Sequence, residues 1–299
     1  MAKDDLSSAV TDLPRELACG LERIGLSTQS LKQVRKGLTS KVWVHEPAVG
    51  PSIVLKLSDP NRGSDLFPNM PEQEWAAMKA LSGRAMSAFP LTLQRLPSGK
   101  SLILSQFISS KTTVTPRALA ELLHKIHGTH PWTGLTNRMS STTELLAEGH
   151  ALLVESSSPV WLTRLAPPDH RRRNLTPQCL VHRDPVPANV AMNTESHAVA
   201  LDWQCPAFGD PCEDIAHATS PGMQSLSETD PVISDQELLD AYRTAEMSRA
   251  FAQMAPYYRW RMACYCHWQL ARGNPIYAVA LERECAALEE ARERADRAG

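Results

Sequence analysis

Three side chains in the middle of the chain carry oxygen atoms at a spacing that suits metal-assisted chemistry. Asp184 and Asn189 lie in the segment 181–189 (VHRDPVPAN), and Asp202 follows in the segment 200–204 (ALDWQ). Carboxylate and amide oxygens are the ligands that Mg²⁺ prefers, and a carboxylate can accept the proton of a hydroxyl group. Asn189 and Asp202 each lie at the end of an expected strand or in its adjoining loop, so hairpin pairing can bring them together. We therefore expect these two residues to bind Mg²⁺ and Asp184 to act as a general base.

A lysine in a short apolar strand is the second candidate. The segment 53–57 (IVLKL) is bounded by proline-containing turns, which is typical of a strand. Side chains alternate between the two faces of a strand, so Lys56 points away from Ile53, Leu55 and Leu57. This places a cation on the face opposite the apolar residues.

The remaining elements suggest how these residues are positioned. Strands are expected over 31–34, 42–44, 91–95 and 101–105, and helices over 71–81 and from Pro116 to a stop at Gly128. From about residue 140 the sequence is mostly helical, with a strand-rich interruption at 179–202. We expect a β-rich N-terminal lobe over 1–107 and a larger helical lobe over 108–299, with the ligand between them, since clefts form at domain interfaces.

The motifs together resemble the aminoglycoside phosphotransferase/choline kinase family, protein-kinase-like enzymes that phosphorylate small molecules. The resemblance rests on the His-x-Asp-x4-Asn loop at 182–189, the Asp-Trp pair at 202–203 and Gly-Asp-Pro-x-x-Asp at 209–214. The protein-kinase catalytic loop has the same His-Arg-Asp-x4-Asn form. The resemblance implies a bilobal, protein-kinase-like α+β fold and the transfer of the γ-phosphoryl group of ATP, with Mg²⁺, to a hydroxyl group.

The resemblance also assigns roles to individual residues. It makes Asp184 the catalytic base, Asn189 and Asp202 the metal ligands, and Lys56 the residue that binds the α- and β-phosphates. The expected partner of Lys56 is a glutamate on the following helix. We prefer Glu74, which shares the apolar face of that helix, and keep Glu72 as the alternative.

The turn that covers the nucleotide is assigned to Gly37, Thr39 and Ser40, whose backbone amides and hydroxyl groups can hold phosphate oxygens. We expect the adenine near Gln106 to Ile108. His182 and Asp210 are expected to hold the catalytic loop in shape, and Asp214 to be only a favourable charge at a helix N-terminus.

Two positions depart from the family pattern. Gln204 stands where many members have a glutamate, which removes a carboxylate near the metal. Arg183 stands where many small-molecule kinases have glycine, and we expect it to pair with a nearby carboxylate.

Two further groups of residues, three histidines and the aromatic face of a helix, are expected to be structural. Three histidines at steps of three, His124, His127 and His130, suggest packing and carbonyl contacts at a helix end. A helix predicted from Pro256 to Gly273 carries an aromatic face, which favours packing in the core. The alternative is that this face forms an aromatic wall that binds a cationic amine.

The tail 281–297 is expected to be an exposed helix.

The composition of the chain argues against some classes of binding partner. The 31 basic and 33 acidic residues give a net charge of −2, which disfavours a nucleic-acid partner. No apolar run is long enough to span a membrane, and seven cysteines without a C-x-x-C pair suggest free thiols in the cytoplasm. The oligomeric state stays open.

The acceptor also stays open among amino alcohols, aminoglycoside-like molecules and sugar-like molecules. A nucleotide-binding scaffold or pseudokinase without phosphotransfer is the alternative function, and Gln204 motivates it. Protein kinase activity is disfavoured because the sequence contains neither Asp-Phe-Gly nor Ala-Pro-Glu.

Overall fold

The chain divides into two compact units. The computed structural model describes residues 15–23, 25–26, 28, 31–36, 39–110, 112–138, 140–172, 176–227 and 232–298. Unit 1 comprises Met1–Lys111 with Met192–Cys205, and unit 2 comprises Thr112–Ala191 with Pro206–Gly299. The segment Met192–Cys205 therefore groups with the N-terminal residues, although it follows the first part of unit 2 in the sequence. The predicted division after residue 107 stays a prediction.

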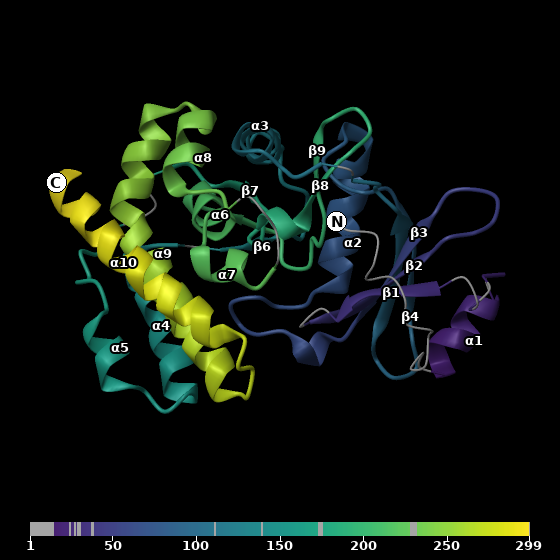
Figure 1. Cartoon of the computed structure of the whole chain (residues 1–299), viewed down its shortest axis with the longest axis horizontal. Helices are drawn as coiled ribbons and strands as arrows, with labels where there is room; N and C mark the ends of the chain where they lie inside the picture. The colour runs from purple at the N-terminus through teal and green to yellow at the C-terminus, as the bar shows by residue number, and fades with distance from the viewer. Residues whose placement is uncertain are drawn as a thin grey trace. The chain divides into compact units, whose positions relative to one another are not determined.

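Unit 1 is built on a five-stranded antiparallel sheet with the order β1-β2-β3-β5-β4 (Figure 1). Its strands are β1 (Leu31–Lys36), β2 (Ser40–His45), β3 (Ile53–Ser58), β4 (Pro90–Arg95) and β5 (Ser101–Gln106). All five strands were predicted, with ends that differ by at most two residues. Strand β3 lies in the middle of the sheet and carries Lys56.

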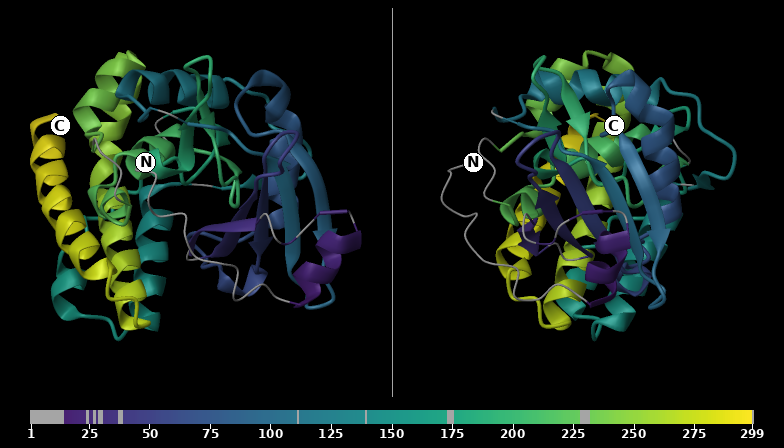
Figure 2. Two further views of the ribbon diagram at one scale, coloured as in Figure 1. Left: turned by 45° about the vertical axis from the view of Figure 1, so that its right-hand side comes forward. Right: turned by 90° about the vertical axis from the view of Figure 1, so that its right-hand side faces the viewer.

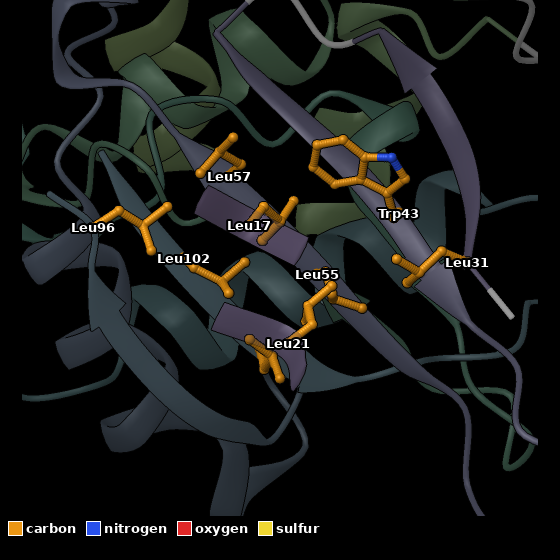
Figure 3. Packing of buried hydrophobic residues seen from close by; sticks show 9 residues of the cluster. Leu17, Leu21, Leu31, Trp43, Leu55, Leu57, Leu96 and Leu102 are labelled. Atoms are coloured by element: carbon orange, nitrogen blue, oxygen red, sulfur yellow. The ribbon is translucent and has the colours of Figure 1, made fainter. Parts of the chain in front are cut away.

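One face of this sheet is covered by helix α1 (Arg15–Arg23). Leu17 and Leu21 of α1 are fully buried against Leu55 of β3 and Leu102 of β5, as Figure 3 shows. Trp43 of β2 belongs to the same apolar cluster. Leu55 and Leu57 both lie on this face, because side chains alternate between the two faces of a strand.

The other face of β3 carries Lys56, and helix α2 (Pro71–Leu81) packs against the neighbouring strands β4 and β5. This helix has the bounds predicted from the sequence. Pro71 occupies the first turn, where its missing N–H costs nothing. The buried residues of α2 include Glu74, Met78 and Leu81, so the inward face predicted from the sequence is confirmed.

Unit 2 is mostly helical, so the predicted α+β class, with a β-rich first part and a helical second part, is confirmed. Its described helices are α3 (Pro116–His127), α4 (Thr142–Glu155), α5 (Val160–Arg164), α6 (Pro211–Ala218), α7 (Pro221–Ser225), α8 (Asp235–Tyr242), α9 (Ala245–Ala271) and α10 (Tyr277–Ala298). Helices α4 and α10 both pack along α9, and the three run side by side in Figures 1 and 2.

Short strands precede and follow the predicted catalytic loop. Strand β10 (Ala207–Gly209) pairs with β6 (Thr136–Asn137) and with β7 (Cys179–Val181). The chain then continues from β7 through the loop 182–186 into a short 3₁₀ turn, Pro187–Asn189. Strands β8 (Val190–Met192) and β9 (Ala198–Ala200) form a two-stranded sheet.

The structure corrects two predictions about the C-terminal helices. Helix α9 begins at Ala245, and Pro256 lies inside it, so the predicted start at Pro256 is wrong. The predicted exposed tail 281–297 lies in α10 and is not fully exposed, because Glu284 and Leu288 are completely buried. Tertiary packing along α9 outweighs the local cost of its interior proline.

The aromatic face of α9 belongs to the core. Tyr257 and Trp260 are buried, and the indole N–H of Trp260 donates to the carbonyl of Leu162. Core packing is therefore confirmed, and these two side chains are not exposed as an aromatic wall. All seven cysteines lie within the described residues and are free thiols. No helix of the described part of the chain is long and apolar enough to span a membrane.

Candidate functional site

The first cluster of predicted site residues lies in unit 1 around the amino group of Lys56. Lys56 Nζ lies 2.7 Å from both carboxylate oxygens of Glu74 and also donates to Oδ1 of Asp202. The lysine and Glu74 are buried, whereas the side chain of Asp202 is 31% exposed. The predicted pairing with Glu74 is present, and Glu72 instead pairs with Arg95 at the surface, so the Glu72 alternative is wrong.

Burial and charge act in opposite directions on this cluster. Burial alone would lower the pKa of Lys56, but the carboxylates of Asp202 and Glu74 raise it above its ordinary value. Burial, together with the charge of Asp202, raises the pKa of Glu74 although Lys56 acts to lower it. The lysine therefore stays a cation at neutral pH although it is buried, which suits a group that binds phosphate oxygens.

Asp202 is held in place by the backbone of the segment that carries it. The preceding strand β9 contacts the α2–β4 connection, where Ala200 N–H donates to Met86 O at 3.2 Å. After Asp202, the carbonyl of Gln204 accepts from the N–H of Met70 at 3.0 Å, just before α2. Asp202 itself has a φ of 58°, a left-handed conformation that aspartate tolerates better than most residues.

The predicted nucleotide turn is fixed by polar side chains from two distant segments. Thr39 Oγ1 donates to Gln204 Oε1 at 2.9 Å. The carbonyl of Thr39 accepts from the amide nitrogen of buried Asn69 at 3.1 Å, and the same nitrogen lies 3.5 Å from the Ser40 hydroxyl. Gly37 lies outside the described residues.

The second cluster lies in unit 2 and forms the loop that follows β7. Asp214 of α6 is completely buried, and its two carboxylate oxygens accept the N–H groups of His182 at 2.9 Å and of Arg183 at 2.6 Å. The ring of His127 on α3 lies 3.1 Å from the same carboxylate. Asp214 therefore fixes the backbone of the loop, which is more than the helix-end charge predicted for it.

Asp184 and Asn189 are joined within this loop. The amide nitrogen of Asn189 donates to the carbonyl and to Oδ2 of Asp184, both at 3.0 Å. The N–H of Asp184 donates to Nδ1 of His182 at 3.2 Å, so His182 holds the loop as predicted. These contacts fix the Asp184 carboxylate relative to Asn189.

Asp210 caps a helix, and Arg183 forms an ion pair. Asp210 caps α6 through the N–H of Cys212 at 2.9 Å and accepts the hydroxyl of Thr176 at 2.7 Å. These contacts anchor the start of α6 and the segment before β7, and the predicted role of Asp210 in shaping the loop stays a prediction. Arg183 lies with its Nε 3.6 Å from a carboxylate oxygen of Glu213, which confirms that it pairs with a carboxylate.

The predicted site residues thus fall into two groups. Lys56, Glu74, Thr39, Ser40 and Asp202 belong to unit 1, and Asp184 and Asn189 belong to unit 2. The assignment of roles to them stays a prediction.

Sequence reasoning missed Asn69 and Asp214 as residues that hold the site. No local signal marks Asn69. Asp214 is part of a recognised motif, but its partners lie some thirty positions earlier in the chain.

The histidines of α3 are structural. His124 Nε2 lies 2.6 Å from the carbonyl of Tyr242, and His127 Nδ1 lies 2.8 Å from the Tyr242 hydroxyl. These contacts confirm the predicted packing and carbonyl contacts for His124 and His127, whereas His130 lies beyond the end of α3 and is exposed. Among the described residues there is no group of three or more histidine, cysteine or acidic side chains that could hold a metal.

Comparison with known proteins shows which family and which solved structures the chain is similar to. The model of a family described as "Phosphotransferase enzyme family" matches residues 30–257. No curated protein sequence matches the chain.

Solved structures of several small-molecule kinases are similar in fold. A spectinomycin phosphotransferase in complex with ADP and spectinomycin is 16% identical with a TM-score of 0.55, covering 90% of this chain and 92% of that one. Choline kinase LicA from Streptococcus pneumoniae is 13% identical with a TM-score of 0.60, covering 92% and 98%. An ethanolamine kinase from Plasmodium vivax is 11% identical with a TM-score of 0.62, covering 92% and 86%. At these identities the likeness shows the fold, which is the kinase-like fold predicted from the sequence.

Proposed function

We propose that this chain, which belongs to the phosphotransferase enzyme family, transfers the γ-phosphoryl group of ATP to a hydroxyl group of a small molecule in a Mg²⁺-dependent reaction. Membership of the family confirms the resemblance stated from the sequence, and with it the prediction of a small-molecule phosphotransferase. The nucleotide, the metal and the acceptor are the parts that we propose.

The nucleotide proposal rests on Lys56 and on the relatives. A cation buried between two carboxylates is costly to maintain, and such groups are concentrated at functional sites. Relatives of the same fold were solved with ADP and with AMP-PNP. We propose that Lys56, held by Glu74, binds the α- and β-phosphates of ATP, and that Gly37, Thr39 and Ser40 cover the phosphates.

The metal proposal rests on the donor atoms of Asn189 and Asp202. Asn189 uses its amide nitrogen to bind Asp184, which leaves its amide oxygen as the donor for a cation. The carboxylate of Asp202 is partly exposed. Mg²⁺ is commonly bound by one or two protein oxygens together with substrate phosphates, and Asn189 and Asp202 would supply two such oxygens. Bound Mg²⁺ would neutralise charge on the phosphate oxygens during transfer.

Asp184 is proposed as the general base. Its carboxylate accepts a hydrogen bond from Asn189 and its backbone is held by His182, so it is preorganised. It would accept the proton of the acceptor hydroxyl while that oxygen bonds to the γ-phosphorus. The bond from the γ-phosphorus to the bridging oxygen breaks, and ADP leaves with that electron pair.

The acceptor is proposed as an amino alcohol, an aminoglycoside-like or a sugar-like molecule. Relatives of the same fold are named for spectinomycin, choline and ethanolamine. The buried aromatic residues of α9 do not favour a cationic amine over a polyol. Two acidic residues that could attract a polycation are engaged elsewhere: Asp235 pairs with Arg259, and Glu237 caps its own helix.

The single observation that carries the proposal is the contact of Lys56 with both Glu74 and Asp202 in a member of this family. The first test is isothermal titration of the protein with ATP and Mg²⁺. Lys56→Met is expected to weaken binding by at least about ten-fold, because it removes the buried cation. Lys32→Met is the matched control, since Lys32 lies on the same sheet and pairs with Glu46 at the surface.

The second test is ADP release across a panel of amino alcohols, aminoglycosides and sugars. At least one acceptor is expected to accelerate ADP release and to yield its phosphate ester. ATP binding without any phosphorylated product would favour the scaffold alternative, which Gln204 motivates. Absence of ATP binding would refute the proposal altogether.

A further inference from the structure

The backbone just before Asp184 adopts a conformation that its residue type disfavours. Arg183 has a φ of 71°, in the left-handed region that glycine adopts readily and that a residue with a β-carbon rarely adopts. The peptide that joins Arg183 to Asp184 therefore needs other contacts to hold it. Such conformations persist where the surrounding structure fixes them, often at functional sites.

One side of this residue is fixed by Asp214, and the other by His217. The N–H of Arg183 donates to Asp214 at 2.6 Å, and the carbonyl of Arg183 is hydrogen-bonded by Nδ1 of His217. Both side chains belong to α6 and are buried. Two residues one helical turn apart thus hold the two ends of the strained residue.

The surroundings of His217 determine which of its ring nitrogens carries the proton. Nη2 of Arg261 lies 3.0 Å from Nε2 of His217, and a guanidinium can only donate. Nε2 must therefore accept, which leaves the proton on Nδ1 to be donated to the Arg183 carbonyl. Burial, together with the charge of Arg261, lowers the pKa of His217 to about 3, so the ring is neutral in the physiological range.

Arg261 is itself held by carboxylates from two other helices. It lies on α9, is fully buried, and contacts Glu148 of α4 at 2.7 Å and Glu213 of α6 at 2.8 Å. Arg138 contacts the same two glutamates at 2.6 and 3.3 Å. A guanidinium bound in this way has little freedom to move.

We propose that His217, oriented by Arg261, is a positioning residue that holds the Arg183–Asp184 peptide so that the Asp184 carboxylate faces the acceptor hydroxyl. The inference rests on the proposed role of Asp184 as general base and adds the contact that keeps it in place. Its alternative is that His217 only stabilises the fold of unit 2.

Substitutions at His217 separate these two roles. The amide nitrogen of an asparagine takes the place of Nδ1, so His217→Asn keeps a donor for the Arg183 carbonyl. The amide of a glutamine reaches the place of Nε2 instead, so His217→Gln loses that donor. The matched control is His267→Gln on α9, where the ring bonds the carbonyl of Ser156 at 3.0 Å away from the loop.

We expect His217→Gln to lower kcat by about 100-fold with the KM for ATP nearly unchanged, because a small displacement of a reacting group has such an effect. His217→Asn should stay within about three-fold of the parent enzyme, because the hydrogen bond is kept. Equal loss in the two variants, or no loss in either, would overturn the proposal.

Arg183→Gly provides an independent test in the same chain. Glycine adopts the left-handed conformation at little cost, so the peptide needs His217 less in this background. We expect His217→Gln to lower kcat far less in the Arg183→Gly protein than in the parent. A loss of the same size in both backgrounds would show that His217 acts through general stability.

Amide hydrogen exchange reports the position of the loop without any reference to activity. His217→Gln should speed exchange of the Asp184 amide by about ten-fold or more, and His217→Asn and His267→Gln should leave it unchanged. If the parent protein phosphorylates no acceptor, the proposed function fails, while this exchange rate still decides whether His217 holds the peptide.

Discussion

At the scale of single residues, the ion pairs of Lys56 are expected to stabilise the folded protein as well as to support ATP binding. Lys56→Met leaves Glu74 as a buried, uncompensated charge, so we expect the free energy of unfolding to fall by about 3–5 kcal/mol. The double variant Lys56→Met/Glu74→Gln should recover much of this loss because it removes both charges. Denaturant titration measures both effects, and Lys32→Met should change stability by less than about 1 kcal/mol. A double variant no more stable than Lys56→Met would contradict the account.

Gln204 is one of the two positions at which the sequence analysis places a departure from the family pattern. Its amide oxygen accepts the hydroxyl of Thr39, and a glutamate would keep this hydrogen bond and add a negative charge. We expect Gln204→Glu to lower the Mg²⁺ concentration needed for half-maximal nucleotide binding about five-fold, equivalent to about 1 kcal/mol for one charge at short range in water. Titration with Mg²⁺ at fixed ATP checks this, with Gln204→Leu as the variant that lacks the hydrogen bond. An unchanged Mg²⁺ requirement in Gln204→Glu would show that position 204 does not influence the metal.

At the scale of elements, the contact of α4 with α9 depends on a glycine. A β-carbon at Gly149 would lie 2.3 Å from the ring of Trp260, closer than any real contact. Alanine favours a helix over glycine by about 1 kcal/mol, but overpacking costs about 1–3 kcal/mol and more for rigid rings. We expect Gly149→Ala to lower the melting temperature, whereas Gly83→Ala, which meets open space, should leave it nearly unchanged. A more stable Gly149→Ala protein would show that α4 and α9 are packed differently.

The elements also show which parts of the structure can be predicted from the sequence. Helix α2 has its predicted bounds because Pro71 and the apolar spacing after it are local signals. Helix α9 was predicted to begin at Pro256 because proline is a local signal too, but the buried residues before it, such as Phe251 and Met254, continue the helix. Packing partners distant in sequence are invisible to such signals.

The same distinction holds for the candidate site. The family resemblance implied a glutamate partner for Lys56 on the following helix, and the periodicity of that helix selected Glu74. The contact of His217 with the Arg183 carbonyl joins residues 34 positions apart and involves a backbone group, which no residue pattern reveals. The family resemblance supplied the motif, and the structure supplied the residues that hold it.

At the scale of the whole molecule, the buried histidine makes stability depend on pH. The native state keeps His217 neutral down to about pH 3, while the unfolded chain binds a proton near its ordinary pKa of about 6.5. The unfolded state thus holds more protons between these values, so stability falls as pH falls through this range. His217 contributes up to about 1.4 kcal/mol per pH unit.

Urea unfolding at several pH values between about 4 and 6.5 tests this linkage. We expect His217→Asn to show a shallower dependence of unfolding free energy on pH than the parent protein, because it removes one titrating group. His267→Gln is again the control. Parallel pH curves for the parent and His217→Asn would show that His217 is protonated in the native state.

Across the whole molecule, the central claim is that this chain moves a phosphoryl group to a small-molecule hydroxyl with Asp184 as the base. The most direct test is the rate at which an identified acceptor becomes its phosphate ester, followed by mass spectrometry, in the parent protein and in Asp184→Asn at equal ATP occupancy. We predict that the parent forms the ester and that Asp184→Asn loses about 10²- to 10⁴-fold in kcat while it still binds ATP. An Asp184→Asn protein that forms the ester at the parental rate would contradict the account.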